Sequence, residues 1–329
     1  MLRHTRRGAR AMLLAALSVL LAVPAVAGAE PGATPSLPLT AEDLGLDGHI
    51  GWADRVGAGP ASLDRSTPEP GPTPSAAPRA TATPTSQPVP EPEPEPIGID
   101  VSWPQCDRDL PEADGFAIVG VNRGRVYSAN PCLAGEDGQL AWAGPDVQLY
   151  LNTGNPGPRD SRHWPVGQDE PRACDAADPD TVDCAYVYGW NAAEHAYQIA
   201  LQAFETLDQA GEGTEADAPL AGMTWWLDVE DANSWRRDRE RNVAALQGMV
   251  DALDALGAGE IGFYSTPRLW NRITGGTETF AEHPAWHAGA SDEADAQRRC
   301  AEEPSFTGGP LRMVQWVQDG LDRNIRCDA

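Results

Sequence analysis

The 329-residue chain is strongly acidic, with 24 basic residues against 49 aspartates and glutamates and a formal net charge of −25; all of its fixed positive side chains are arginine. Nucleic acids and anionic membranes are bound largely by neutralising phosphates, so this balance argues against both as partners. The six histidines show no metal-ligand spacing, and we expect neither a metal nor a cofactor. We expect a monomer.

Residues 1–29 have the form of a secretory signal peptide. A basic start is followed by an uncharged apolar run over residues 11–27 and by small residues that offer an A-x-A cleavage site. A retained membrane anchor is the alternative, but the run is short and contains Pro24. The pair Arg6 and Arg7 leaves the choice between general and twin-arginine export open. We expect a protein that is secreted, either extracellular or associated with the cell wall.

Residues 30–96 are rich in Pro, Ala, Thr and Glu and end in alternating Pro and Glu. Such a composition cannot bury enough apolar surface to offset the entropy of ordering, which predicts a disordered, extended linker. At Ile97 the composition becomes that of a globular domain, which we expect to run from residue 97 to residue 329.

Apolar, strand-like runs recur through this domain, and two longer segments between them have helical spacing. The helices are expected over residues 191–211 and 234–257, with Asn191 as an N-cap. Alternating strands and helices indicate a parallel sheet, and eight strands indicate an α/β fold of the (β/α)8 type, with short or missing helices after the first three strands. The expected strands are residues 97–103, 116–124, 147–154, 184–190, 223–230, 261–267, 284–290 and 311–318.

Active sites of such barrels lie at the carboxyl ends of the strands. Polar or aromatic side chains occupy these ends and are our candidate site residues. They are Asp100, Asn122, Asn152, Trp190, Asp228, Glu230, Tyr264, His287 and Gln315, although a lone strand histidine such as His287 is more often structural.

The segment WWLDVE, residues 225–230, carries two of these acids on one strand face, because side chains alternate along a strand. Glycosidic bond cleavage needs one carboxylic acid held neutral and a second group that stabilises developing positive charge. Burial and the neighbouring Asp228 are expected to raise the pKa of Glu230, leaving Asp228 ionised. The alternative is a solvated strand end that caps the next helix.

Six cysteines in the folded region favour three disulfides in an exported protein, although fifteen pairings are possible. Our hypothesis pairs sequence neighbours. The pairs are Cys106 with Cys132, Cys174 with Cys184, and Cys300 with Cys327.

Five motifs resemble, in order, the strand-end motifs of glycoside hydrolase family 25 lysozymes. More closely, the domain is similar to a secreted actinobacterial branch with a glycoside-hydrolase-like barrel of poorly defined function. The motifs are GIDVSWPQ (98–105), WWLDVE (225–230), GFYSTPRLW (262–270), AWHAGA (285–290) and QWVQDGLDRN (315–324).

The resemblance implies a role for each matching residue. Glu230 would be the general acid/base, and Asp228 would orient a substrate 2-acetamido group that acts as internal nucleophile, with retention of configuration. The substrate implied is the β-1,4 bond between N-acetylmuramic acid and N-acetylglucosamine in peptidoglycan. Asp100 and Asp322 would be the other acidic site residues, with Tyr264 and Trp286 as substrate contacts; Asp322 could instead belong to a surface turn.

Two features depart from the family pattern. Arg123 and Arg125 follow the second strand where the family has an acidic stretch, and residues 156–183 form an insertion. Both would alter the rim of the cleft. A catalytically weak or inactive barrel that binds cell-wall glycan or serves as a scaffold is therefore the alternative function.

Overall fold

The computed structural model describes residues 96–113, 115–210 and 220–327. The predicted signal peptide and nearly all of the predicted linker lie outside these residues. Within them, eight strands close into a barrel in the order β1 to β8, which confirms the predicted fold class. The strands are β1 (Gly98–Val101), β2 (Ala117–Gly120), β3 (Gln148–Asn152), β4 (Trp225–Asp228), β5 (Ile261–Ser265), β6 (Ala285–Ala290), β7 (Leu311–Gln318) and β8 (Leu321–Arg326).

The barrel is parallel from β1 to β7, and β8 closes it antiparallel to both neighbours. A two-residue turn joins β7 to β8, and both of its residues, Asp319 and Gly320, have positive φ. Asp-Gly is a preferred pair for such a hairpin turn, because its twist matches that of the flanking strands. The closing strand therefore needs no crossover helix.

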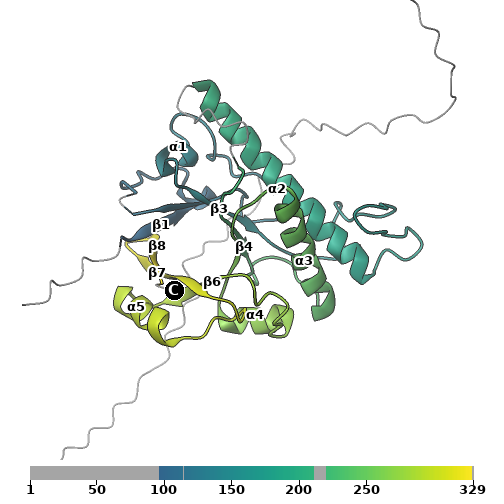
Figure 1. Ribbon diagram of the computed structural model, residues 1–329. Coiled ribbons are helices and arrows are strands. Elements are labelled where there is room, and N and C mark those ends of the chain that lie inside the picture. Colours follow the sequence, from purple (N-terminus) through teal and green to yellow (C-terminus); the bar gives the residue numbers. More distant parts are fainter. Residues whose placement is uncertain (1–95, 114, 211–219, 328–329) are drawn as a thin grey trace, which may run out of the picture. The chain divides into compact units, whose positions relative to one another are not determined.

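The helices are unequal in length and cover the barrel unevenly (Figure 1). Only a 3-10 turn, η2 (Trp103–Gln105), follows β1, and a five-residue helix follows β2. The longest helix follows β3, so the expectation of short helices is correct for the first two strands and wrong for the third. The helices are α1 (Gln139–Ala143), α2 (Val182–Ala210), α3 (Arg239–Ala255), α4 (Pro267–Thr274) and α5 (Glu293–Glu302).

The predicted strand at residues 184–190 is wrong, because these residues form the first turns of α2. The helix begins ten residues earlier than expected for an Asn191 cap, at residue 182 and not at residue 192. Thr181 stands before it, and its side-chain oxygen accepts a hydrogen bond from the Cys184 backbone N–H. A short apolar run does not by itself distinguish a strand from a buried helix.

The start of α2 looks strand-like in sequence because it is buried where it crosses α3. A Cβ added to Gly189 would lie 1.8 Å from the Ala245 carbonyl oxygen, and one added to Gly248 would lie 2.0 Å from the Tyr186 carbonyl oxygen. Glycine is unfavourable inside a helix, but here it permits close backbone approach. The eighth strand is consequently residues 321–326, and the WWLD segment is the fourth strand.

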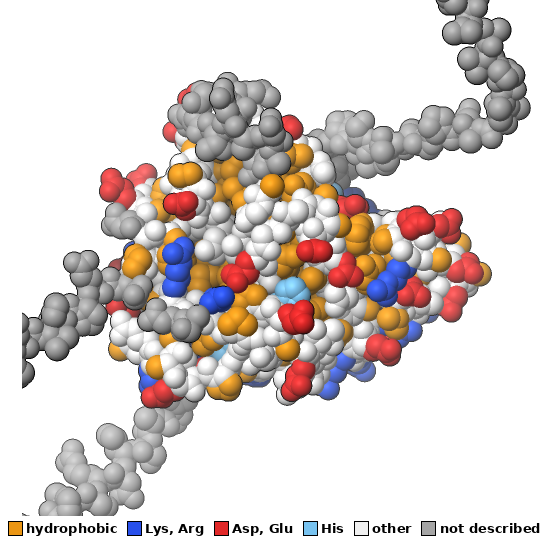
Figure 2. All heavy atoms as spheres, in the orientation of Figure 1, with side chains coloured by type: hydrophobic (Ala, Val, Ile, Leu, Met, Phe, Trp, Pro, Cys, Tyr) orange, Lys and Arg blue, Asp and Glu red, His pale blue; other side chains and the backbone are white. Residues whose placement is uncertain are grey.

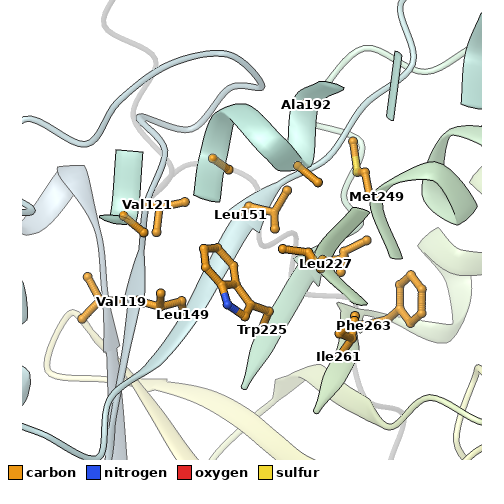
Figure 3. Close-up of a cluster of buried hydrophobic side chains, with 14 of the residues drawn as sticks. Val119, Val121, Leu149, Leu151, Ala192, Trp225, Leu227, Met249, Ile261 and Phe263 are labelled. Carbon is orange, nitrogen blue, oxygen red and sulfur yellow. The ribbon is translucent and has the colours of Figure 1, made fainter. Parts of the chain in front are cut away.

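Side chains alternate across the barrel wall. Trp226 lies in the barrel interior with Ile118, Trp286 and Met313, whereas Trp225 lies in the outer core. In that outer core, side chains of β3, β4 and β5 pack against α2 and α3 (Figure 3). The alternation aims Asp228 and Glu230 to the same side as Trp226, toward the barrel axis.

All three disulfides pair sequence neighbours, which confirms the hypothesis. They join Cys106 to Cys132, Cys174 to Cys184, and Cys300 to Cys327. The second one ties the insertion to the start of α2. Exposed acids gather on this insertion, toward the right of Figure 2: Asp160, Asp169, Glu170, Asp175 and Asp178.

Candidate active site

Four carboxyl groups from three strands gather at one end of the barrel interior. β1 carries Asp100, β4 ends at Asp228 with Glu230 two residues beyond it, and β8 carries Asp322. The antiparallel pairing of β1 with β8 sets Asp100 directly opposite Asp322. The charge of Asp100 raises the pKa of each of the other three carboxyls, and among the described residues none of the four takes part in a salt bridge.

Asp100 is the best hydrogen-bonded of the four. Its Oδ2 accepts hydrogen bonds from the side-chain amides of Asn324 at 2.6 Å and Gln315 at 3.0 Å. Burial raises its pKa to about 6, although these two hydrogen bonds favour the ionised form and oppose the shift. Asp100 is therefore the strongest acid of the cluster.

Asp228 keeps one oxygen unpaired. The Asn152 side-chain amide donates to its Oδ2 at 2.5 Å, whereas its buried Oδ1 has no hydrogen-bond partner among the described residues. Burial raises the pKa of Asp228 to about 7, with a further contribution from the negative charge of Asp100. A buried acceptor without a partner is costly, so Oδ1 is suited to receive a hydrogen bond from a ligand.

Glu230 lies just beyond β4 and is half-buried. Burial, followed by the charges of Asp228, Asp231 and Asp100, raises its pKa to about 9. Among the described residues no side chain hydrogen-bonds to its carboxyl group, while its backbone oxygen accepts the indole N–H of Trp235 at 2.7 Å. Glu230 is thus protonated at neutral pH and has its proton free for a ligand.

Asp322 is the second acid whose carboxyl group accepts no hydrogen bond among the described residues. Burial raises its pKa to about 8, with Asp100 and Glu230 contributing and Arg108 opposing. Because it lies in β8 and not in a surface turn, the alternative reading of the GLDRN segment is wrong.

Aromatic and amide side chains of the barrel interior support the acid cluster through hydrogen bonds. The Tyr264 hydroxyl donates to Gln315 Oε1 at 2.8 Å, and Gln315 in turn donates to Asp100. The Trp286 indole N–H donates to Asn324 Oδ1 at 2.8 Å. Tyr264 and Gln315 are therefore in place beside the acids, as expected.

Trp286 is only 1% exposed, so its ring forms the floor of the site and cannot present a face to a sugar in this structure. The predicted substrate contact is corrected to a supporting role, because Trp286 lies inside a ring cluster with Tyr264 and Trp226. Asn324, which supports Asp100, was missed from the sequence. The Asp-Gly turn predicts a strand after it, and side chains alternate along a strand, so Asn324 could have been expected on the same face as Asp322.

Two other candidates do not join the cluster. Trp190 lies within α2, where its ring packs near Tyr186, so its predicted place at a strand end is wrong. His287 faces the outer side of β6, stacks on Phe306 and has Nδ1 3.6 Å from a Glu303 carboxylate oxygen. Burial lowers the pKa of His287, in keeping with the structural role favoured for it.

Asn122 and Asn152 support one another at the ends of β2 and β3. The Asn122 side-chain oxygen accepts the Asn152 backbone N–H at 2.9 Å, and its amide donates to the Ser128 carbonyl. Asn152 is therefore held in position to reach Asp228. The loop after β2 also carries Arg123, whose guanidinium lies over the Trp103 ring, 5.7 Å from its centroid.

The arrangement combines a protonated acid with a carboxyl that titrates near neutrality. Neither Asp228 nor Glu230 caps the next helix, because Asp238 fills that position and accepts from the Arg241 backbone N–H. The pair is thus free for chemistry. Within the described residues, no group of three or more His, Cys, Asp or Glu is arranged to hold a metal ion, and no helix is long and apolar enough to cross a membrane.

Comparison with known proteins gives matches to lysozymes. The family model described as lysozyme-like protein 1 matches residues 196–307. This segment contains Asp228 and Glu230 but neither Asp100 nor Asp322. Two Dictyostelium discoideum proteins, "Probable GH family 25 lysozyme 4" and "Probable GH family 25 lysozyme 2", are 38% and 40% identical over 99 and 101 residues.

These alignments cover 30% and 31% of this chain and 43% and 44% of the two relatives, so the chain spans less than half of their length. A muramidase from Trichobolus zukalii matches with 16% identity, 71% coverage of this chain, 94% coverage of its own and a TM-score of 0.43. A bacterial lysozyme from Streptomyces coelicolor matches with 15% identity, 72% and 94% coverage and a TM-score of 0.42.

The sequence matches confirm the predicted resemblance to the glycoside hydrolase family 25 lysozyme-like superfamily. The closer likeness to an actinobacterial branch stays a prediction. The assignment of the barrel rests on the strand pairing of this chain.

Proposed function

We propose that this protein is a secreted muramidase-type glycoside hydrolase. It cleaves the β-1,4 bond between N-acetylmuramic acid and N-acetylglucosamine in peptidoglycan, with substrate-assisted retention of configuration. The observation that carries the proposal is a Glu230 carboxyl kept protonated at neutral pH beside an Asp228 carboxyl with an unpaired oxygen.

In the first step Glu230 protonates the glycosidic oxygen as the bond from that oxygen to the anomeric carbon breaks. The carbonyl oxygen of the substrate 2-acetamido group attacks the same carbon and closes a five-membered ring. Asp228 Oδ1 accepts the acetamido N–H, which orients that group and stabilises the positive charge that it gains.

In the second step the Glu230 carboxylate takes a proton from water, and the oxygen of that water attacks the anomeric carbon. The ring opens, the acetamido group is restored and Glu230 is again protonated. Two inversions at one carbon give net retention. Asp100, the strongest acid of the cluster, keeps negative charge close to the developing cation, and Tyr264 and Gln315 hold Asp100 in place.

Export fits the disulfides and the predicted leader. Three disulfides persist in oxidising compartments, and the peptidoglycan substrate lies outside the cytoplasm. We therefore place the protein outside the cell or at the cell wall, with the predicted linker as a spacer.

Release of reducing sugar from purified peptidoglycan tests the proposal. Glu230→Gln keeps the shape of the side chain but removes the proton donor, and general acid catalysis is worth about 10² to 10⁴ in rate, so we expect a loss of about 10³-fold. Glu260→Gln, at an exposed position before β5, is the matched control and should retain wild-type rates. Equal rates for wild type and Glu230→Gln would rule out the assigned acid.

A second candidate function is a catalytically weak or inactive barrel that binds cell-wall glycan. It is favoured by Arg123 and Arg125 in the loop after β2, because the family that this chain resembles has an acidic stretch there. Peptidoglycan binding by the wild type without any release of reducing sugar would favour this binding module over the enzyme.

A further inference from the structure

An open pocket of about 620 Å³ lies next to the carboxyl cluster, between the β4–α3 connection and the end of α4. Four of its lining side chains are arginines, which is unusual for a chain with a net charge of −25. The lining residues are Asp231, Asn233, Trp235, Arg236, Arg237, Arg239, Arg272 and Ile273.

Two of the four arginines already have carboxylate partners. Arg236 makes a two-pronged contact with Asp180 of the insertion, and Arg272 pairs with Asp231. Arg237 and Arg239 are exposed, and neither forms an ion pair with any residue in the described part of the chain. The pocket therefore keeps two positive charges available to a ligand.

The nearest remaining acids do not cancel this charge. Asp238 pairs with Arg241 and caps α3 through the same carboxyl group. Glu240 is exposed in the first turn of α3, and no ion pair joins it to Arg237 or Arg239 within the described residues.

The pocket borders the proposed catalytic site through two lining residues, Asp231 and Trp235. Asp231 lines it and also raises the pKa of Glu230. Trp235 lines it and donates its indole N–H to the Glu230 backbone oxygen. The pocket therefore lies within reach of substituents on a glycan held across Glu230.

The insertion supports the pocket wall from behind, by holding the lining residue Arg236. Asp180 holds Arg236, and its backbone oxygen accepts a hydrogen bond from Arg241 at 2.7 Å. A Cβ added to Gly157 would lie 3.0 Å from an Arg236 guanidinium nitrogen, so the insertion closes against this side chain. The departure from the family pattern thus shapes a cationic surface beside the acids.

We propose that this pocket binds the carboxylates of the peptide stem carried by muramic acid, an inference that rests on the proposed function. Neutral sugar hydroxyls need no fixed cation, whereas the planar guanidinium matches a carboxylate with two parallel hydrogen bonds. A volume of about 620 Å³ has room for a short peptide segment and not only for a single ion. The protein would thereby distinguish stem-bearing glycan from bare glycan.

Binding by the Glu230→Gln variant of the full chain tests this inference without turnover. Two soluble glycans are compared, one with its peptide stems and one from which an amidase has removed them, both stripped of phosphate-containing polymers. Arg237→Gln with Arg239→Gln should weaken binding of the stem-bearing glycan about threefold to tenfold, as two exposed ion pairs allow, and leave the bare glycan unchanged. Added salt should reduce the difference.

Arg268→Gln, an exposed arginine of α4 outside the pocket lining, is the matched control and should bind both glycans like its parent. Equal affinity of the parent for the two glycans would overturn the stem site while leaving the proposed function intact. If the parent distinguishes the two glycans only when phosphate-containing polymer is left attached to them, the pocket binds phosphate, and the stem site is again overturned. Binding of neither glycan would overturn both proposals.

Discussion

Two charged regions meet at the connection that leaves β4, the acid cluster and the arginine pocket, and they differ in sign and in burial. The acids Asp100, Asp228, Glu230 and Asp322 gather in the barrel mouth. Among the described residues Arg108 is the one cation that opposes a pKa shift of these acids, and it acts on Asp322. The arginines of the adjacent pocket are exposed or paired with surface acids. Opposite charges thus lie close in sequence without neutralising each other.

The difference teaches how the protein sets protonation. An Arg beside a carboxylate would favour its ionised form and lower its pKa, as Arg236 does for Asp180. None of the four acids forms an ion pair among the described residues, so burial raises the pKa of every one of them, and neighbouring carboxylates raise those of Asp228, Glu230 and Asp322 further. Keeping the arginines outside the barrel therefore preserves the proton on Glu230.

The largest effect is expected when one acid of the cluster loses its charge. Asp228→Asn should lower the rate of peptidoglycan cleavage by about 10²- to 10³-fold, because it removes the negative charge that stabilises the positive charge gained by the acetamido group. It should also lower the pKa of Glu230, since the charge of Asp228 is the largest electrostatic contribution to its shift. The alkaline limb of the pH–rate profile, which reports deprotonation of Glu230, should move to lower pH.

Asp254→Asn, an exposed position on α3, is the control and should leave both the rate and the pH profile unchanged. An unchanged alkaline limb in Asp228→Asn would contradict the coupling between the two acids.

A smaller effect is expected on stability. Carboxyls whose pKa is higher in the folded than in the unfolded state make the folded protein bind more protons, so the free energy of unfolding should fall as pH rises. The window runs from about 4, the unfolded value, to about 9, the folded value for Glu230.

Urea unfolding across this window should show that Glu230→Gln reduces the fall by about 1 to 3 kcal/mol, because one titrating group has been removed. Glu260→Gln should follow the wild type. Parallel curves for wild type and Glu230→Gln would mean that the acids are not buried together as described.

The smallest effect is expected at the surface pair that shapes the arginine pocket. Asp180→Asn should lower the free energy of unfolding by about 0.5 to 1 kcal/mol, because a two-pronged but partly exposed ion pair is lost. Asp183→Asn removes a weaker, more exposed pair with Arg172 and should have almost no effect. If Asp180→Asn and Asp183→Asn lower the free energy of unfolding equally in thermal unfolding, the Asp180 contact does not anchor the insertion.

The errors in the predicted order of strands came from one short segment. Residues 184–190 are apolar throughout, and no periodicity within seven residues separates a strand from a helix that is buried on every side. Counting them as a strand displaced the later strands by one and hid β8, even though Asp319 and Gly320 are a strong hairpin signal.

The sequence by itself determined what depends on local pattern. Alternation placed Asp228 and Glu230 on one face of a strand, neighbouring cysteines paired as expected, and strand-end motifs indicated a barrel of this family. Only the tertiary structure decided which groups meet. Asp100 and Asp322 lie 222 residues apart and become neighbours because β8 pairs antiparallel with β1.

Burial was likewise decided by the fold. The raised pKa of each acid and the unpaired Asp228 oxygen depend on how much water the packed barrel excludes, which no local pattern encodes. The same holds for Trp286. Its place in a strand-end motif suits a sugar contact, but its ring is enclosed beneath the site. Distant segments determine that environment, so it appears only when the chain has closed.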